Sequence, residues 1–332
     1  NDRMRDSLRG GNFDHNTRSD QGFINGLFLN PNHSPWNTDT PKSAEAQAEQ
    51  LLNYTQLIRL SMAGNLANFN LSGVKGKSLS YRGQPPAGYT QDPQENVNYV
   101  SAHDNYTLWD QIAAKAPLNT PTATRARMQQ LGLAAVILGQ GVPFLHAGSE
   151  ILRSKSGDGD SYDSGDWFNA LDWSYNDNGW GRGLPAAWRN EKEWPFWEPL
   201  LPQPQFKPTA SDIEAHFKMV RALLQTRKAS PLFRLRTAEA IQKQVRFLNA
   251  EAGKAQTPGL IAMHIQGNTA QDPKRKAVLV VLNASPNPVR LRHPLLNAPW
   301  QSFTLSDGTQ AFPALKNNTV PGYGISILEQ SH

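Results

Sequence analysis

The chain has no cysteine among its 332 residues. Disulfide bonds, thiolate catalysis and cysteine-ligated zinc are therefore excluded, although the absence does not select a cellular compartment. No run of about 18 consecutive apolar residues is present, so the sequence predicts no membrane-spanning helix. No N-terminal signal peptide is visible either. This composition is compatible with secretion but does not require it.

A concentrated basic stretch is also missing. The formal net charge is +5, but lysine and arginine are dispersed along the chain. Nucleic-acid-binding surfaces gather these residues into a patch or stripe, so we expect no nucleic-acid partner. Hydrophobic residues make up 38% of the chain, which is enough for a substantial core. At this length, one large domain with a smaller one is the default organisation.

Tryptophan, in contrast, is abundant and unevenly distributed. Six of the nine tryptophans fall in one region rich in glycine, aspartate and asparagine: Trp167, Trp173, Trp180, Trp188, Trp194 and Trp197. Flat aromatic rings beside polar groups suit carbohydrate, because sugar rings also have apolar faces. Alternatively, a loop-rich segment uses these large side chains to build a small core of its own. The sequence leaves both interpretations open.

The first two thirds of the chain alternate short apolar runs with helical patterns. Residues 97–100 and 142–147 have the pattern of buried strands. Helices are predicted at 43–63, 107–115, 122–139 and 211–229. The first begins after Ser43, a favourable N-cap residue. Residues 1–10 resemble a strand exit or a helical turn, and 153–210 a long loop. This spacing is typical of parallel βαβ units.

From about residue 233 the pattern changes to short strands separated by turn residues. Strands are predicted at 245–248, 260–265, 277–282, 289–291, 302–305 and 324–328. Short strands at this spacing are typical of an antiparallel β-sandwich, and we expect no helix beyond residue 240. The predicted fold class is therefore α/β plus all-β. Residues 1–232 form the domain of parallel units, and residues 233–332 the β-sandwich domain.

The strand predicted at 97–100 is followed by three polar residues, His103, Asp104 and Asn105. In a parallel α/β barrel, the loops after the strands carry the chemistry, which makes Asp104 a candidate catalytic carboxylate. From these residues alone a structural role is an equal alternative, because aspartate between a strand and a helix is a common helix cap.

Several segments, taken together in this order, resemble the type I pullulanase and limit-dextrinase group of glycoside hydrolase family 13. Residues 1–10 look like the segment after the sixth barrel strand, 97–105 like the seventh strand and 141–150 like the eighth. The most group-specific likeness is Leu-Arg-Ser-Lys-Ser at 152–156, followed by Ser-Tyr-Asp-Ser-Gly-Asp-Trp-Phe-Asn at 161–169. The resemblance covers essentially the whole chain.

This resemblance implies a starch- and glycogen-debranching enzyme that hydrolyses α-1,6-glucosidic linkages in pullulan and limit dextrins. The family fold is a (β/α)8 TIM barrel, of which residues 1–232 look like the C-terminal portion. Its retaining mechanism uses a carboxylate nucleophile, a general acid and a third carboxylate that stabilises the transition state. Asp104 matches that third carboxylate, and His103 matches the neighbouring donor to a sugar hydroxyl.

The family's nucleophile and general acid follow earlier strands, and neither motif occurs here. The resemblance therefore implies two partners, an α-glucan substrate and the N-terminal remainder of the enzyme, and the chain alone is expected to be inactive. Isoamylase or another family 13 α-glucanase is the enzymatic alternative, and a non-catalytic glucan-binding fragment is the alternative of another class. An extracellular or periplasmic location is expected, with the cytoplasm as the alternative.

Other polar residues, at the predicted strand ends or on the loop after the last one, are candidates for contact with sugar hydroxyls: Asn105, Glu150, Arg153, Tyr162, Asp163 and Asn169. For Arg153, a structural pair with an aspartate is an equal alternative. For Glu150, the equal alternative is a hydrogen-bonding role in the pocket wall. The residues therefore do not decide between binding and structural roles.

The sequence requires no cofactor. An acidic cluster suggests calcium, but Tyr162 occupies a ligand position of the EF-hand pattern. The cluster consists of Asp158, Asp160, Asp163 and Asp166. A solvated or arginine-paired loop is favoured, and calcium is kept as the alternative. Histidines without metal-ligand spacing are interpreted as structural or surface residues: His33, His146, His216, His264 and His293.

Overall fold

The computed structural model describes residues 1–11, 20–32, 42–163, 166–250 and 256–332. The α-helices in these ranges are α1 (Asp2–Arg9), α2 (Ala44–Met62), α3 (Leu108–Lys115), α4 (Thr122–Leu138), α5 (Ala187–Asn190), α6 (Trp194–Trp197), α7 (Ala210–Ala229) and α8 (Ala238–Gln244). The four long helical predictions are confirmed to within one residue at each end. Ser43 caps α2 as predicted, because its side chain accepts a hydrogen bond from the amide of Ala46.

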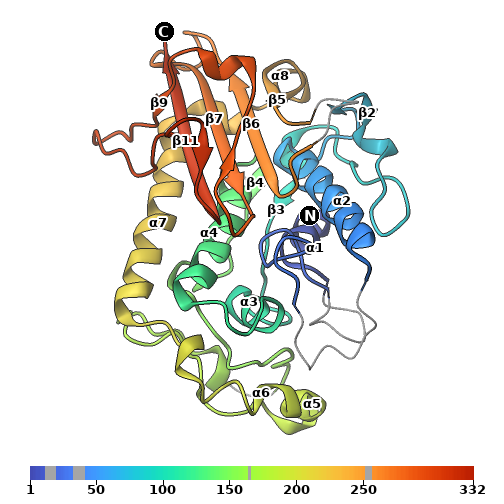
Figure 1. Cartoon of the computed structure of the whole chain (residues 1–332), viewed down its shortest axis with the longest axis vertical. Helices are drawn as coiled ribbons and strands as arrows, with labels where there is room; N and C mark the ends of the chain where they lie inside the picture. Colours follow the sequence, from blue (N-terminus) through green and yellow to red (C-terminus); the bar gives the residue numbers. More distant parts are fainter. Residues whose placement is uncertain (12–19, 33–41, 164–165, 251–255) are drawn as a thin grey trace.

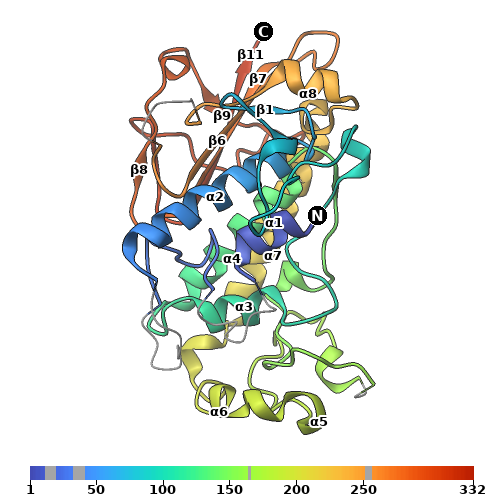
Figure 2. The same ribbon diagram turned by 90° about the vertical axis from the view of Figure 1, so that its right-hand side faces the viewer.

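The C-terminal part forms an antiparallel sheet with the strand order β5-β6-β7-β11-β9. Its strands are β5 (Val245–Phe247), β6 (Leu260–Gln266), β7 (Arg275–Asn283), β9 (Gln301–Ser302) and β11 (Gly324–Ser331). Each pairing in the sheet is antiparallel, as the sequence predicts. In Figures 1 and 2 this sheet lies at one end of the molecule, while α5 and α6 lie at the opposite end.

Both faces of this sheet are buried, because successive side chains along its central strands point to opposite faces. Ile261 and Met263 of β6 join the large core shared with α2 and α4, whereas Leu260 and Ala262 join a smaller core on the other face. Strands β8 (Val289–Arg290) and β10 (Thr319–Val320) form a two-stranded antiparallel ribbon that contributes to the smaller core. In the described part of the chain, the second layer of the predicted sandwich is this ribbon and its loops.

A second, parallel pairing lies in the first part of the chain. Strands β3 (Val97–Asn98) and β4 (Val142–Pro143) pair in parallel, with Val97 opposite Val142. The parallel βαβ prediction is therefore confirmed here, although both strands are shorter than predicted. The other short strands are β1 (Asn70–Leu71) and β2 (Val74–Lys75), an antiparallel hairpin. The described residues form no closed barrel.

Helices α1 and α8 decide two of the predictions made from the sequence. Residues 2–9 form α1, which decides between a strand exit and a helical turn. The expectation that no helix extends beyond residue 240 is wrong, because α8 ends at Gln244. Thr237 caps α8 by accepting a hydrogen bond from the amide of Ala240, and the side chain of Ile241 is fully buried. Local capping and one core contact thus outweigh the strand-like pattern nearby.

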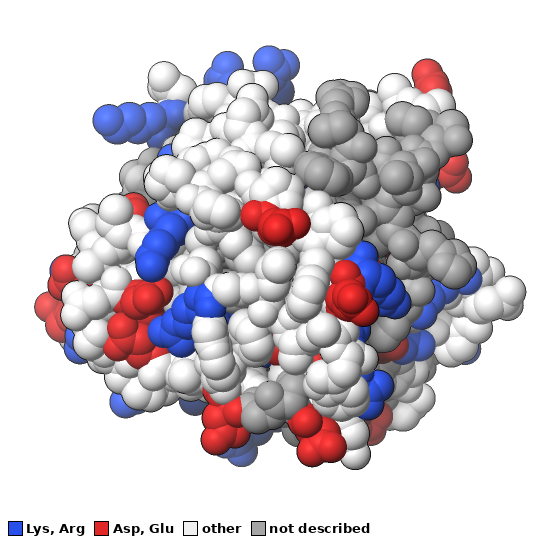
Figure 3. Space-filling view, turned by 90° about the horizontal axis from the view of Figure 1, so that it is seen from below, with Lys and Arg blue, Asp and Glu red and all other residues white. Residues whose placement is uncertain are grey.

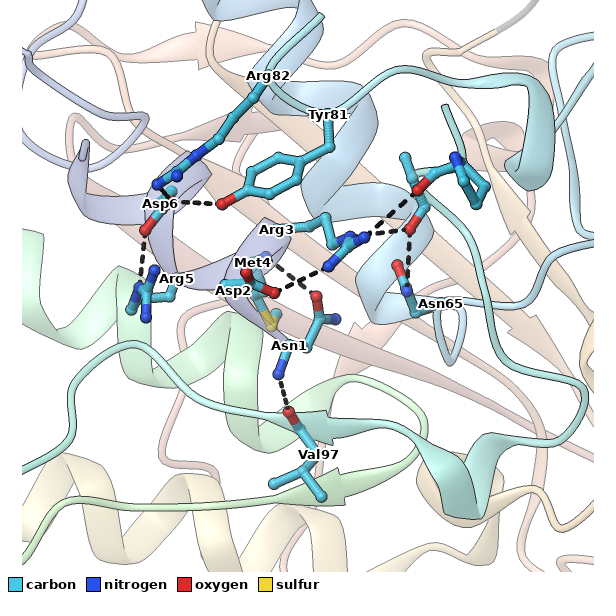
Figure 4. Close-up of polar contacts among 12 residues, drawn as sticks. Asn1, Asp2, Arg3, Met4, Arg5, Asp6, Asn65, Tyr81, Arg82 and Val97 are labelled. Atoms are coloured by element: carbon cyan, nitrogen blue, oxygen red, sulfur yellow. Dashed lines mark hydrogen bonds and ion pairs between the residues drawn. The ribbon is translucent and has the colours of Figure 1, made fainter. Parts of the chain in front are cut away.

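Helix α1 is held in place by an ionic network around Asp6 (Figure 4). The carboxylate accepts hydrogen bonds from Arg5 at 2.7 Å, from the hydroxyl of Tyr81 at 2.5 Å and from Arg82 at 2.7 Å. Burial alone would raise the pKa of Asp6. The hydrogen bonds from these donors have the larger effect and hold the pKa below its ordinary value. Arg3 of the same helix donates to the carbonyl of Ala87. The network joins α1 to the irregular segment that precedes β3.

Candidate active site

The carboxyl ends of β3 and β4 bring polar residues together, since adjacent parallel strands end at the same edge. Ser101, His103 and Asp104 follow β3, and His146 follows β4. Nδ1 of His103 lies 3.0 Å from Oδ1 of Asp104, and their side chains are 88% and 78% exposed. The predicted catalytic carboxylate therefore lies on the surface, in the loop between β3 and α3.

The helix-cap alternative for Asp104 is contradicted by the start of α3. The N-cap of this helix is Thr107, whose hydroxyl accepts a hydrogen bond from the amide of Asp110 at 3.2 Å. Asn105, which lies between Asp104 and Thr107 in the chain, is half-buried and has a left-handed φ of 64°. This turn directs the chain from the strand end into α3. Asp104 lies before the turn and outside the cap.

His146 has a more central place than the sequence indicated. Its Nε2 lies 3.1 Å from Nη1 of Arg153, and its Nδ1 lies 3.1 Å from the hydroxyl of Ser101. Arginine only donates, so Nε2 accepts, and the neutral ring donates from Nδ1 to Ser101. Burial, followed by the charge of Arg153, lowers the pKa of His146 to about 4. His146 thus links the ends of the two strands as a neutral ring.

Arg153 extends this link to the loop after β4. The residue is 8% exposed and donates to the carbonyl of Ala147 at 3.1 Å and to the carbonyl of Asn169 at 2.8 Å. Burial lowers the pKa of Arg153. These contacts bring Arg153 and Asn169 together. In these hydrogen bonds the partners of Arg153 are the imidazole of His146 and backbone carbonyls, and not the aspartate that was considered as its structural partner.

Asp110 of α3 fixes the backbone just after Arg153. Its carboxylate accepts hydrogen bonds from the hydroxyl of Ser154 at 2.5 Å and from the amide of Lys155 at 2.8 Å. Desolvation raises the pKa of this fully buried group to about 6, although the same hydrogen bonds oppose the shift. Sequence reasoning missed both Asp110 and Ser101. Two features of the sequence could have indicated them. Asp110 lies in the first turn of a predicted helix, and Ser101 directly follows a predicted strand.

The remaining predicted binding residues have varied environments. The side chain of Tyr162 is 73% exposed, and Asp163 and Asn169 are also exposed. Glu150 accepts a hydrogen bond from the amide of Gly148 at 2.9 Å, a local contact that fits the wall role. The structure brings Arg153 and Asn169 to one cluster with His146.

The acidic cluster has basic neighbours. Asp158 lies 3.9 Å from the ammonium of Lys155, and Asp160 lies 3.8 Å from the guanidinium of Arg189. Among the described residues, no three histidines or carboxylates are grouped to hold a metal ion. Asp160 is thus paired with an arginine, as the favoured interpretation expects, whereas the basic neighbour of Asp158 is a lysine.

Most of the remaining histidines have structural surroundings. His216 and His264 are buried, and burial lowers the pKa of each to about 4. His293 caps a short 3-10 turn by accepting a hydrogen bond from the amide of Leu295. His33 lies outside the described residues.

Comparison with known proteins identifies relatives over almost the whole chain. Residues 175–321 match the family described as "Alpha-1,6-glucosidases, pullulanase-type, C-terminal". Pullulanase 1 of Arabidopsis thaliana, a chloroplastic protein, is 43% identical over 89% of this chain and 31% of its own length. Pullulanase of Klebsiella pneumoniae is 38% identical over 99% of this chain and 31% of its own length. The chain is homologous to the C-terminal portion of pullulanases.

The structural comparison agrees with this pullulanase homology. The maltotriose complex of PulA from Klebsiella pneumoniae matches all of this chain with a TM-score of 0.88 and 34% identity, and the match covers 36% of that protein. The chain thus spans about a third of the length of these relatives. Within its described residues, no helix is both long and apolar enough to cross a membrane.

Proposed function

We propose that the chain belongs to a debranching glycoside hydrolase that cleaves α-1,6-glucosidic linkages in pullulan and limit dextrins. The observation that carries this proposal is Asp104, an exposed carboxylate in the loop after a parallel strand, in a chain homologous to pullulanases. Because Asp104 neither caps α3 nor joins the core, its carboxylate is available to a ligand.

Asp104 acts in this proposal as the third carboxylate of a retaining mechanism, favouring positive charge that develops on the sugar. His103 donates a hydrogen bond to a sugar hydroxyl. Substrate contacts are proposed for Asn105, Glu150, Arg153, Tyr162, Asp163 and Asn169. The hydrogen bonds from Arg153 to Asn169 and from His146 to Ser101 support a pre-organised site. No cofactor is required in this mechanism, and calcium is the alternative.

The proposal includes a (β/α)8 barrel whose other strands, with the nucleophile and general acid, lie upstream of this chain. Exposed apolar side chains support it: Val97 and Val142 of the β3–β4 pair are 41% and 44% exposed, and Phe144, just after β4, is 54% exposed. A neighbouring strand would cover such residues. The chain alone is therefore expected to be inactive. An extracellular or periplasmic location is proposed, with the cytoplasm as the alternative.

The test compares hydrolysis of pullulan, which contains α-1,6 linkages, with hydrolysis of linear amylose, which does not. The full-length enzyme that contains this chain is expected to release reducing sugar from pullulan, while residues 1–332 alone release none. Preferential hydrolysis of amylose would favour another family 13 α-glucanase. Binding of pullulan without hydrolysis by the full-length protein would favour a glucan-binding protein.

A further inference from the structure

The structure divides the clustered tryptophans between the two roles considered for them. Trp180 and Trp197 are 1% and 0% exposed and pack in a satellite core with Trp109 and Phe206. In contrast, Trp188 is 54% exposed. The core-building interpretation therefore explains some of these residues and leaves Trp188 without a packing role.

Trp188 belongs to a group assembled from two segments of the chain. The guanidinium of Arg189 lies over the Trp188 ring, 4.3 Å from its centroid, and over the Tyr162 ring at 5.5 Å. Stacking of one planar guanidinium covers only part of each ring, and Tyr162 and Trp188 remain 73% and 54% exposed. Two exposed rings and a partly exposed cation thus form one surface on and beside α5. We call it the Tyr162–Trp188 surface.

This surface is held by buried and charged contacts. The side chain of Asn190, which is 3% exposed, accepts from the amide of Gly159 at 3.2 Å and donates to the carbonyl of Asp160 at 3.3 Å. The carboxylate of Asp160 accepts from the amide of Tyr162 at 3.1 Å and lies 3.8 Å from Arg189. The rings are therefore placed before any ligand binds, which lowers the entropic cost of binding.

A chain of hydrogen bonds connects this surface with the proposed active site. Arg153, which contacts His146, donates to the carbonyl of Asn169, and the amide group of Asn169 donates to the hydroxyl of Ser161 at 3.2 Å. Ser161 directly precedes Tyr162. The Tyr162–Trp188 surface is thus linked to the carboxyl ends of β3 and β4.

Resting on the proposed function, we infer that the Tyr162–Trp188 surface binds a segment of the α-glucan chain away from the linkage that is cleaved. Ring faces contact the apolar faces of glucose units, and the guanidinium of Arg189 donates to hydroxyls. A neutral polymer fits the surroundings, because uncharged surface predominates at this end of the molecule and acidic and basic side chains are interspersed (Figure 3). The surface favours long glucans, which reach both it and the strand ends.

Affinity electrophoresis of the 332-residue chain in native gels containing amylopectin tests this inference. Trp188→Ala is expected to raise the dissociation constant for amylopectin about tenfold, the loss of roughly one stacking contact. Arg189→Ala is expected to weaken binding in the same direction, because the rings lose their shared support. Trp173→Ala is the matched control, since Trp173 is 58% exposed in the same segment but outside the group. Thermal melts should be unchanged for all three variants.

The inference would be overturned by any of three results. Trp188→Ala leaves the retardation unchanged, Trp173→Ala weakens binding as much as Trp188→Ala does, or the unmodified chain is not retarded at all. Pullulan hydrolysis by the full-length enzyme, measured separately, distinguishes this result from the proposed function. A chain whose retardation depends on Trp188, in an enzyme that fails to hydrolyse pullulan, would support the binding surface while overturning the debranching activity.

Discussion

Asp6 and Asp104 each lie beside a basic side chain, but only Asp6 is buried. Asp6 is 4% exposed and accepts hydrogen bonds from Arg5, Tyr81 and Arg82, whereas the side chain of Asp104 is 78% exposed beside His103. Removing a buried carboxylate leaves its donors without a charged partner, while an exposed pair contributes little to stability. The same residue type therefore has a structural role in α1 and is available for chemistry after β3.

Asp6→Asn is expected to lower the free energy of unfolding by about 3 kcal/mol, because it breaks a buried ionic network. The pKa of Asp6 is held below its ordinary value of 3.8. Its contribution is therefore present above about pH 4 and lost as pH falls through the folded-state pKa. Urea unfolding at pH 7 and pH 3 measures both effects.

The control for Asp6→Asn is Asp2→Asn on the same helix, since Asp2 forms a more exposed pair with Arg3. Asp2→Asn should change the unfolding free energy by less than about 1 kcal/mol. Equal effects of the two substitutions would contradict the structural role of Asp6.

At the scale of elements, the loop after β4 depends on α3. Asp110→Ala removes the acceptor for Ser154 and Lys155 and is expected to cost about 2–3 kcal/mol, because buried donors lose their partner. Limited proteolysis should show faster cleavage at 153–158. Asp172→Ala is the control, because Asp172 also accepts from a backbone amide, that of Ser174, but on the surface. Unchanged proteolysis of Asp110→Ala would contradict the role of Asp110 in holding this loop.

The sequence predicts the long helices and the central strands because their signals are local. Ser43, for example, caps α2 through the residue three positions later, and the near-continuous apolar runs of β6 and β7 follow from burial on both faces. The exposed place of Asp104 after a strand agrees with the sequence pattern, whereas its catalytic role rests on the resemblance and stays a prediction. The barrel, the domain boundary at 232/233 and the substrate contacts stay predictions.

Contacts between distant segments were not predictable. His146 had no metal spacing, and only its contacts with Ser101 and Arg153 show its place in the site. The pairing of Arg189 with Tyr162 depends on how a long loop folds back on itself. Such loops carry little periodicity, so their side-chain partners are set by tertiary packing.

At the scale of the whole molecule, buried histidines predict a loss of stability in mild acid. Burial lowers the pKa of His146, His216 and His264 from 6.5 to about 4, so the unfolded chain binds protons first as pH falls below 6.5. Each histidine is expected to cost about 2 kcal/mol between pH 7 and pH 5. Asp110 opposes them, because its raised pKa of about 6 lets the folded state bind a proton first, which adds about 1 kcal/mol.

Urea unfolding at pH 7 and pH 5 measures the sum, which should be a net loss. His264→Gln should reduce this loss of unfolding free energy by about 2 kcal/mol, the contribution expected from one histidine. A stability that rises from pH 7 to pH 5 would contradict the burial of these rings as neutral groups.

The central claim is that Asp104 stabilises the transition state of α-1,6 hydrolysis. The most direct measurement is kcat on pullulan for Asp104→Asn in the full-length enzyme, together with a thermal melt. The control is Asp307→Asn, which changes an exposed aspartate in a turn between β9 and β10. Removing one preorganised charged group should lower kcat by about 10²–10³ with an unchanged melting temperature. Near-normal kcat, or a loss of activity that follows only from unfolding, would contradict the account.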